Sequence, residues 1–421
     1  MRRALAIVLV ALAAGCAGGE GVTRSGPDPA KATLALVGGR VQPAPGAAAI
    51  PDGVVLVEGG VIAAVGTRAA VRVPPGARVL DCAGATVTAG FWNAHVHFTE
   101  PVWNDAASAP VERLTTGLRA MLTSYGVVGV LDTGSFPANT TALRRRIESG
   151  EIPGPTILTA GGGFAPAGGS PFYIRPLTLP ELTKPEDAEP MVARMLAAGA
   201  DAVKLFTGSY AEPNRIVVMP VEIVRAAVEA AHRRGKPVVA HPSNSPGARA
   251  ALEGGVDILA HTFPSEVEGP WDRSLPPRMR ERGMALTPTL KLWPFELGRL
   301  GLPPAVVERV LATGQAQVKA FADLGGQILF GTDVGYMSDY DPTDEYVYLQ
   351  GAGLTYAQIL AALTTAPTER LGLAARRGRL APGLDADLAV VEGDPERDIR
   401  ALARVRYTLR GGRVIFERER R

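Results

Sequence analysis

Short apolar runs alternate with longer amphipathic segments through the middle of the chain, from about residue 88 to residue 371. Segments rich in Ala, Arg and Glu, such as 221–235, separate the runs and have helical character. The eight apolar runs cover 88–98, 126–134, 155–164, 201–208, 237–244, 257–263, 285–292 and 327–335. Buried parallel strands read as continuous apolar runs, and regular strand–helix alternation implies a parallel sheet. The pattern predicts an α/β fold in which 88–371 form a (β/α)₈ barrel, or TIM barrel.

Both ends of the chain have a different pattern. Before the barrel, and again after residue 371, short β-rich pieces are separated by Gly and Pro and lack helical periodicity. We therefore expect 33–87 and 372–421 to form one small composite β-sandwich domain.

The first residues have the features of an export signal. Arg2 and Arg3 precede the apolar run 4–14, which is too short to span a bilayer permanently, and Cys16 follows two alanines and a glycine. This resembles a bacterial lipoprotein signal. Residues 1–16 are then a signal peptide ending in a lipidated Cys16, and 17–32 are a flexible tether. The expected location is the periplasmic or cell-surface side of a membrane that holds the lipid anchor. Plain secretion and an uncleaved anchor are the alternatives.

Composition and charge exclude some classes of partner. The chain of 421 residues has 46% hydrophobic and 20% charged residues, and its 44 basic and 42 acidic side chains give a net charge of +2. No basic stripe stands out, so we expect no nucleic-acid partner. Besides Cys16 the only cysteine is Cys82, in an apolar run, which predicts a buried residue and no internal disulfide.

Four of the five histidines fall at the ends of predicted strands. His95 and His97 lie at strand one, His241 at strand five and His261 at strand six. Barrel enzymes build their active sites at the carboxyl ends of the strands. Residues two apart on a strand face the same way, so the first two imidazoles form a candidate pair of metal ligands. His232 lies in a predicted outer helix and has no predicted role.

Two further charged residues occupy strand ends. Lys204 ends strand four, where an unpaired buried charge is costly, and Asp333 follows strand eight. Together with the histidine motifs, the segments VKLFTG, FGTDVG and LAPGLDADLAVVEGDP make the chain resemble the amidohydrolase superfamily over essentially its whole mature length. The overall pattern is similar to the imidazolonepropionase and Xaa-Pro-dipeptidase-like branches.

The resemblance implies a binuclear metal centre. Its six ligands would be His95, His97, Lys204, His241, His261 and Asp333. Lys204 would carry a carbamate derived from CO₂ that bridges the two metals. The donor set suits Zn²⁺, with Mn²⁺, Co²⁺ or Fe²⁺ as alternatives. A water between two cations loses a proton near neutral pH, and the resulting hydroxide would cleave an amide, cyclic amide or dipeptide bond. Asp333 would be the catalytic proton shuttle.

The sequence departs from the superfamily pattern at Asn93, where many relatives have an acid two residues before the first ligand. An amide can orient a neighbour but supplies no charge. Six residues in the expected loops are candidate substrate contacts: Trp103, Tyr173, Arg175, Tyr210, Trp293 and Tyr336. Such aromatics suit a medium-sized organic substrate, and Arg175 could bind a substrate carboxylate.

Other functions remain open from the sequence. A lactonase or phosphotriesterase-like hydrolase could use the same metal centre. A deaminase fits less well, because those relatives lack the bridging lysine. A non-catalytic ligand-binding surface lipoprotein is the alternative from another class, and the intact set of ligands argues against it. The resemblance also leaves a homo-oligomer open.

Overall fold

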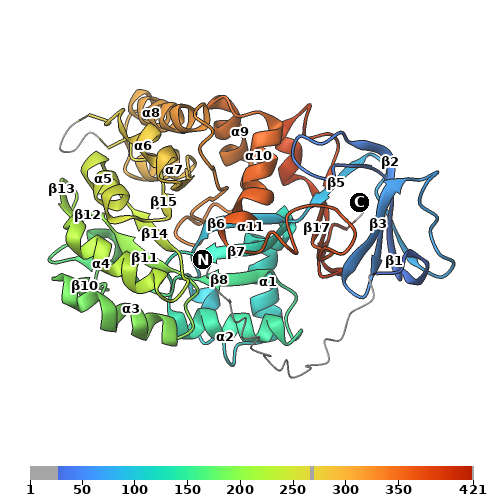
Figure 1. Cartoon of the computed structure of the whole chain (residues 1–421), viewed down its shortest axis with the longest axis horizontal. Coiled ribbons are helices and arrows are strands. Elements are labelled where there is room, and N and C mark those ends of the chain that lie inside the picture. The colour runs from blue at the N-terminus through green and yellow to red at the C-terminus, as the bar shows by residue number, and fades with distance from the viewer. Residues whose placement is uncertain (1–26, 266–269, 420–421) are drawn as a thin grey trace, which may run out of the picture.

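We analysed a computed structural model, which describes residues 27–265 and 270–419. Figure 1 shows two regions side by side: a large α/β region, and a small sheet made of blue N-terminal strands and red C-terminal strands. Within the described residues, no helix combines the length and apolar character needed to cross a bilayer.

The apolar runs of the middle region form short parallel strands with almost entirely buried side chains. The strands are β6 (Phe91–Val96), β7 (Val127–Asp132), β8 (Thr156–Thr159), β9 (Gly163–Pro166), β11 (Val203–Phe206), β14 (Val238–His241), β15 (Ile258–Ala260) and β16 (Ala285–Thr287). They belong to two sheets, ordered β6-β7-β8 and β10-β9-β11-β14-β15-β16, where β10 spans Glu181–Leu182. Every pairing among them is parallel. Burial on both faces explains why the runs lack polar alternation.

Two of the expected strands differ in detail. The third run divides into β8 and β9, and β9 pairs with β11. The eighth run forms no regular strand; Ile328 makes a parallel bridge to β16, and Val334 makes one to β6. The backbone therefore connects the last parallel strand to the first through residues 327–335. Hydrogen bonds from Leu329 N to Leu286 O, 2.8 Å, and from Ala94 N to Phe330 O, 2.7 Å, continue this connection.

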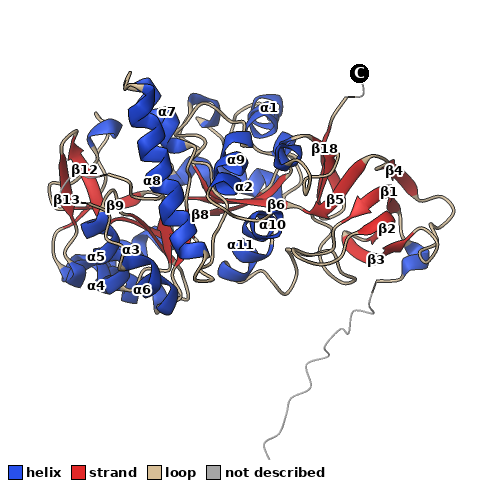
Figure 2. Ribbon diagram, turned by 90° about the horizontal axis from the view of Figure 1, so that it is seen from above, coloured by secondary structure: helices blue, strands red, loops and turns tan. Residues whose placement is uncertain are grey.

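Helices lie on both sides of these strands (Figure 2). They are α1 (Val111–Met121), α2 (Pro137–Glu148), α3 (Ala188–Ala197), α4 (Val221–His232), α5 (Ser245–Gly254), α6 (Leu275–Glu281), α7 (Leu292–Arg299), α8 (Pro304–Ala322), α9 (Thr343–Gly351), α10 (Tyr356–Leu363) and α11 (Thr365–Arg370). Helix α4 illustrates why they form: Ile223, Ala227 and Ala230 recur at helical spacing and are buried in the core between helices and strands.

The two chain ends combine in one mixed sheet of eight strands. Its order is β19-β18-β17-β5-β1-β2-β3, with β4 also paired to β1. The strands are β1 (Leu34–Val41), β2 (Ile50–Glu58), β3 (Val61–Thr67), β4 (Arg78–Asp81), β5 (Ala85–Ala89), β17 (Leu388–Glu392), β18 (Val405–Arg410) and β19 (Arg413–Glu417). The antiparallel β5–β17 pair joins the two ends. Because β5 reaches Ala89, the run beginning at Thr88 is shared between this sheet and β6.

Shorter elements complete the structure. A hairpin of β12 (Gly208–Glu212) and β13 (Arg215–Val218) follows β11. The 3-10 helices are η1 (Pro29–Lys31), η2 (Pro101–Trp103), η3 (Thr123–Tyr125), η4 (Phe172–Ile174), η5 (Pro185–Asp187) and η6 (Ile399–Ala403).

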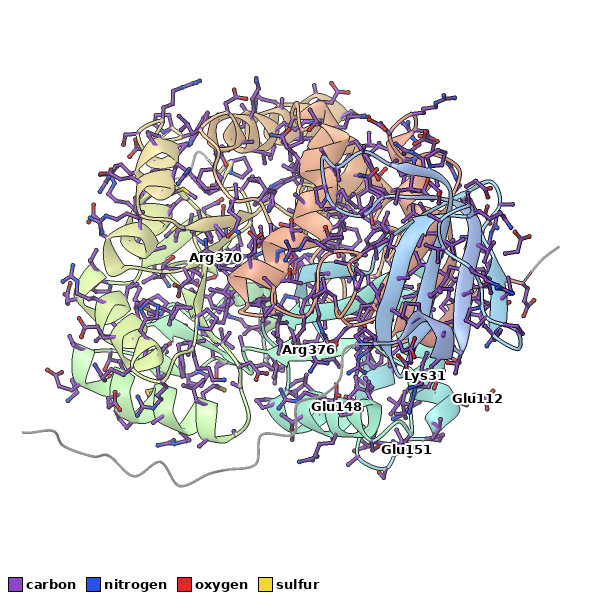
Figure 3. The ribbon with its side chains drawn as sticks, turned by 45° about the vertical axis from the view of Figure 1, so that its right-hand side comes forward. Lys31, Glu112, Glu148, Glu151, Arg370 and Arg376 are labelled. Atoms are coloured by element: carbon purple, nitrogen blue, oxygen red, sulfur yellow. The ribbon has the colours of Figure 1, made fainter. Side chains whose placement is uncertain are left out.

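Ion pairs and hydrogen bonds cross the boundary between the small sheet and the α/β region. Arg410 of β18 pairs with Glu148 of α2 at 2.5 Å, and Arg377 donates to Thr156 Oγ1 of β8 at 2.7 Å. Arg377 also pairs with Asp385 at 3.1 Å. Figure 3 labels Glu148 on the α2 side of this boundary and Arg376 close to it. These contacts hold the small sheet against helix α2 and the first residue of strand β8.

The predictions for the leader fall largely outside the described residues. The structure does not describe residues 1–26. This range holds the predicted signal peptide 1–16 with Cys16 and most of the tether, so these stay predictions. The described end of the expected tether is ordered, because η1 caps on Asp28 and Ala32 packs into the small sheet. Cys82 is buried and free, as expected, and burial raises the pKa of its thiol to about 12.

Candidate metal centre

The strand ends bring the predicted ligand side chains together. His95 lies on β6, Lys204 on β11 and His241 at the end of β14. His261 directly follows β15, and Asp333 is held against β6 by a hydrogen bond from its N–H to His95 O at 2.9 Å. The carboxyl ends of parallel strands meet at one edge, which is why residues far apart in sequence converge here.

Asp333 is the centre of the cluster. Its Oδ1 lies 2.9 Å from His97 Nε2 and 3.3 Å from His95 Nε2, and its Oδ2 lies 3.9 Å from His261 Nδ1. His95, His261 and Asp333 each place one donor atom within 4.8 Å of the others. All three side chains are buried. This histidine–histidine–aspartate cluster has the composition and spacing of a metal site.

The remaining ligand candidates continue the cluster along the rim. The rings of His95 and His261 lie 4.4 Å apart between centroids, and those of His261 and His241 lie 4.7 Å apart. His241 in turn contacts Phe206, whose ring lies 5.6 Å from Lys204 Nζ. The four histidines, the lysine and the aspartate therefore occupy one contiguous site, as expected from the strand ends.

Hydrogen bonds set which nitrogen of each ring can bind a metal. His97 Nδ1 contacts Gly134 O at 2.6 Å, and a carbonyl only accepts, so Nδ1 donates and Nε2 is left free. His241 Nε2 lies 3.1 Å from Ser243 Oγ, which itself donates to Gly208 O at 2.9 Å. His241 thus donates from Nε2 and keeps its Nδ1 lone pair.

A hydrogen bond with Thr289 likewise determines which nitrogen of His261 can bind a metal. Its Nδ1 lies 2.7 Å from Thr289 Oγ1, which donates to Pro288 O at 2.9 Å. The hydroxyl therefore accepts from Nδ1, and Nε2 stays free. In contrast, neither ring nitrogen of His95 makes a well-formed hydrogen bond among the described residues, and the nearest contact is that of Nε2 with Asp333 Oδ1 at 3.3 Å. A buried polar atom without a partner is costly, which indicates an additional group at this position.

The charges of the cluster suit cation binding. Burial and the Lys204 charge lower the pKa of His95 and of His241 to about 3, so both rings are neutral at neutral pH. Burial also acts to lower the pKa of His97, but Asp333 carries it above its ordinary value. Burial alone would raise the pKa of Asp333, yet the surrounding histidines hold it well below its usual range. The site therefore contains an ionised carboxylate that favours a protonated His97, while burial keeps His95, His241 and His261 neutral.

Lys204 is the exceptional member of the site. It is 2% exposed, and no ion pair or hydrogen bond of its Nζ is found among the described residues. Burial lowers the pKa of this amine to about 8, opposed by the charges of Asp333 and Asp132. The amine is thus much easier to deprotonate than that of an exposed lysine.

Backbone strain is concentrated in the same place. Of the six non-glycine residues with positive φ in the described ranges, four surround the cluster. They are Ser243 at +53°, His261 at +68°, Thr289 at +45° and Asp333 at +64°. Thr289 is the most unusual, because β-branched residues rarely adopt this region. Such strain often accompanies functional sites.

The donor set fits one or more divalent metal ions. His97 donates from Nδ1, so in the neutral form of the ring the Nε2 lone pair would face an oxygen of ionised Asp333 at 2.9 Å. Two acceptors in such contact need a proton or a cation between them. Imidazole nitrogens with carboxylate oxygens are typical zinc ligands.

Comparison with known proteins agrees with this site. The model of the amidohydrolase family matches residues 86–415. The chain belongs to the amidohydrolase family. The family match confirms the predicted superfamily. Structural neighbours named as prolidase and Xaa-Pro dipeptidase agree with the predicted Xaa-Pro-dipeptidase-like branch, and the imidazolonepropionase-like branch stays a prediction.

Two solved structures have the same fold as this amidohydrolase. A protein from Bifidobacterium longum assigned as a prolidase has a TM-score of 0.77 and 26% identity, covering 92% of this chain and 96% of that one. An Xaa-Pro dipeptidase with bound methionine has a TM-score of 0.77 and 22% identity, covering 91% and 99%. Among curated sequences, amidohydrolase tasK of Hapsidospora irregularis is 26% identical over 390 residues, which are 82% of this chain but 38% of tasK. This amidohydrolase spans less than half the length of the curated relatives that it matches first.

Four of the six candidate substrate residues have contacts at or near this rim. The Tyr173 and Tyr336 rings lie 5.8 Å apart in an edge arrangement. Burial raises the pKa of Tyr173 well above its ordinary value, with Tyr336 and Asp333 adding to the shift. Tyr210 donates to Ser265 Oγ at 2.8 Å, and Trp293 donates to Thr262 Oγ1, next to His261, at 2.7 Å.

The other two candidates have different surroundings. Trp103 is 1% exposed and packs edge-on against Phe98, at 5.2 Å, in the core beside α1, so its ring presents no surface to a substrate. Arg175 is 57% exposed and pairs with Glu212 of the β12–β13 hairpin at 2.8 Å. A substrate carboxylate would have to compete with Glu212. Away from the site, His232 pairs with Asp257 at 2.8 Å on the outer face of α4 and is half-exposed.

Two residues outside the predicted ligand set hold the ligands in place, and the first, Asn93, is the amide that departs from the superfamily pattern. Asn93 accepts from His95 N and Thr332 N, both at 3.2 Å, and donates to Thr332 Oγ1 at 2.6 Å. It therefore ties the first ligand strand to the segment before Asp333. The second, Asp132 at the end of β7, was not predicted from the sequence; a polar residue ending a buried apolar run is the signal that could have identified it.

Proposed function

We propose that this amidohydrolase is a metal-dependent hydrolase that cleaves an amide, cyclic amide or dipeptide bond. We also propose that its eight parallel segments close into a (β/α)₈ barrel. The observation that carries the function is the 2.9 Å contact between His97 Nε2 and Asp333 Oδ1, which needs a proton or a cation and lies at the centre of a buried histidine cluster. A divalent cation resolves this contact without protonating the ring.

Two divalent ions, with Zn²⁺ as the first candidate, fit the available donors. One ion would be held by His95, His97 and Asp333, and the other by His241 and His261. The tautomers assigned above leave one nitrogen free for a metal in each of His97, His241 and His261, and the assignment of residues to the two ions follows the family resemblance. When bound, such ions polarise a substrate carbonyl and make water acidic near neutral pH.

Lys204 would complete the centre as a carbamate. Its neutral amine attacks CO₂, a nitrogen–carbon bond forms and a proton leaves, so a buried cation becomes an anionic oxygen donor between the two groups of histidines. The lowered pKa and the absence of a described partner for Nζ support this role. The modification removes the cost of a buried unpaired ammonium.

Asp333 would move the proton. Its carboxylate stays ionised at neutral pH, because the neighbouring histidines hold its pKa low. It can accept a proton from the attacking water and return it to the leaving nitrogen, as general acid–base catalysis requires. Tyr173 and Tyr336 would border the substrate, since both lie near Asp333.

The similarity to proteins named as prolidase and Xaa-Pro dipeptidase supports dipeptides as the first substrates to test. The decisive experiment combines elemental analysis of metal per chain with hydrolysis assays on dipeptides, N-acyl amino acids, cyclic amides, lactones and phosphotriesters. Two metals and carbon–nitrogen cleavage are expected. Turnover of only lactones or phosphotriesters would favour the alternative hydrolase. A metal-loaded protein without any turnover would indicate the non-catalytic binding protein.

The domain organisation and location also belong to the proposal. We propose a barrel over 88–371, a composite β domain from 33–87 and 372–421, and export with a lipid anchor on Cys16. Homo-oligomer formation is tested by sedimentation of the soluble chain.

A further inference from the structure

A buried carboxylate lies beside the metal centre without belonging to its predicted ligands. Asp132, at the end of β7, is fully buried. Its Oδ1 accepts from Ser135 Oγ at 2.5 Å and from Gly134 N at 3.2 Å, and its Oδ2 accepts from Thr159 Oγ1 at 2.6 Å. Burying a carboxylate is expensive, and these three bonds offset part of the cost.

The bonds shape a turn that contacts His97 directly. Gly134 has φ of +155°, a backbone conformation that is essentially restricted to glycine, and its carbonyl oxygen lies 2.6 Å from His97 Nδ1. Ser135 Oγ, the same hydroxyl that donates to Asp132, accepts from Phe98 N at 2.7 Å. The turn therefore holds the His97 side chain and the backbone of the next residue.

We propose that Asp132 is a positioning residue for the metal centre, acting on His97 through the turn of residues 132–135. By fixing the Gly134 carbonyl against Nδ1, it selects the tautomer that presents the Nε2 lone pair and holds the ring in one orientation. Partners of this kind around metal-bound histidines typically contribute 10–100-fold to metal affinity. The inference rests on the proposed metal centre.

A purely structural role predicts a different outcome. If Asp132 only stabilises the fold, its removal lowers the stability of the protein. The affinity of the site for metal and the coordination geometry of the bound metal then stay unchanged. Asp387 provides the matched control, because it is also a buried aspartate and accepts from a backbone N–H, that of Gly411, at 2.7 Å. It lies beside the small sheet, where it pairs with Arg377 at 3.4 Å.

The experiment compares Asp132→Ala, Asp132→Asn and Asp387→Ala in the full mature chain. Affinity for Zn²⁺ is measured by competition with a chromophoric chelator, and the Co²⁺-loaded proteins are compared by visible absorption. For Asp132→Ala we expect the affinity for Zn²⁺ to fall about 10–100-fold at the metal position that includes His97. We also expect a changed spectrum of the Co²⁺-loaded protein. Asp132→Asn keeps an acceptor for the turn, so a smaller loss is expected. Asp387→Ala lowers Tm and leaves both metal readouts unchanged.

The outcomes separate the two proposals. Equal metal affinity and Co²⁺ spectra in the wild type and Asp132→Ala would overturn the positioning role, whatever the change in Tm. If Asp132→Ala does not fold, Ser135→Ala is the second variant, because it removes one donor to the Asp132 carboxylate and one acceptor for Phe98 N. Unchanged metal affinity and Co²⁺ spectrum in Ser135→Ala would also overturn the positioning role. A wild-type protein that binds no metal would instead overturn the proposed function itself.

Discussion

Replacing Lys204 gives the sharpest test of a binuclear centre. The side chain is 2% exposed, and burial lowers the pKa of its amine to about 8. At pH 7.5 roughly one such amine in four is neutral, compared with about one in a thousand for an exposed lysine of pKa near 10.4. The neutral form is the one that reacts with CO₂, so burial raises the fraction of reactive amine by about two orders of magnitude.

Metal loading that depends on the carbamate should increase with pH. Deprotonation increases as pH rises through the pKa, so loading at fixed dissolved CO₂ should increase from pH 6.5 to pH 8.5. With a pKa of about 8, the neutral fraction rises roughly 25-fold over this interval. The assay reconstitutes metal-free protein with Zn²⁺, with and without bicarbonate, and measures metal per chain together with the ¹³C signal of a carbamate from labelled bicarbonate.

Lys204→Met keeps the length and burial of the side chain but cannot form a carbamate. We expect it to lose one of two metals whether or not bicarbonate is present. A smaller variant, Lys204→Ala, leaves room for acetate or formate to restore part of the second metal. Two tightly held metals in Lys204→Met, or wild-type loading that is independent of bicarbonate, would refute the reasoning.

Three other predictions concern separate parts of the molecule. Asp333→Asn keeps a coordinating oxygen but cannot carry a proton, so activity should fall far more than metal content; equal losses in the two assays would exclude the proton-shuttle role. Burial raises the pKa of Glu345 from 4.5 to about 7, so the folded state holds a proton that the unfolded chain has lost, and stability falls by about 3 kcal/mol as pH rises from 4.5 to 7. Glu345→Gln should remove this component, measured from denaturant midpoints at pH 5 and pH 8, and an unchanged pH profile would contradict it. Cys16→Ser should move the exported protein from the membrane fraction to the soluble fraction, and continued lipid labelling of the variant would argue against lipidation at Cys16.

The sequence by itself determined the strand ends that carry the candidate metal ligands. Apolar runs that end near His95, His241 or His261 and alternate with helical segments are typical of buried parallel strands, and parallel strands bring those ends together. The family follows from the same motifs. The sequence could also indicate that Lys204 needs a compensating group, because an unpaired ammonium is costly among apolar neighbours.

Tertiary structure decided what periodicity cannot express. Trp103 has the sequence context of a loop aromatic, but packing against Phe98 places it in the core. Asp132 gives no sequence signal beyond its place at a strand end, since its importance comes from Gly134 and Ser135 folding back towards His97.

The eighth apolar run, residues 327–335, is a second place where the sequence pattern did not predict the backbone structure. Its apolar pattern predicts a strand, yet the backbone makes only isolated bridges there, and Asp333 within it adopts a positive φ beside the histidines. Local sequence encodes burial and spacing. The tautomers, the strained ligand backbone and the second layer of contacts depend on which neighbours the fold brings within hydrogen-bonding distance, and so they were decided by the tertiary structure alone.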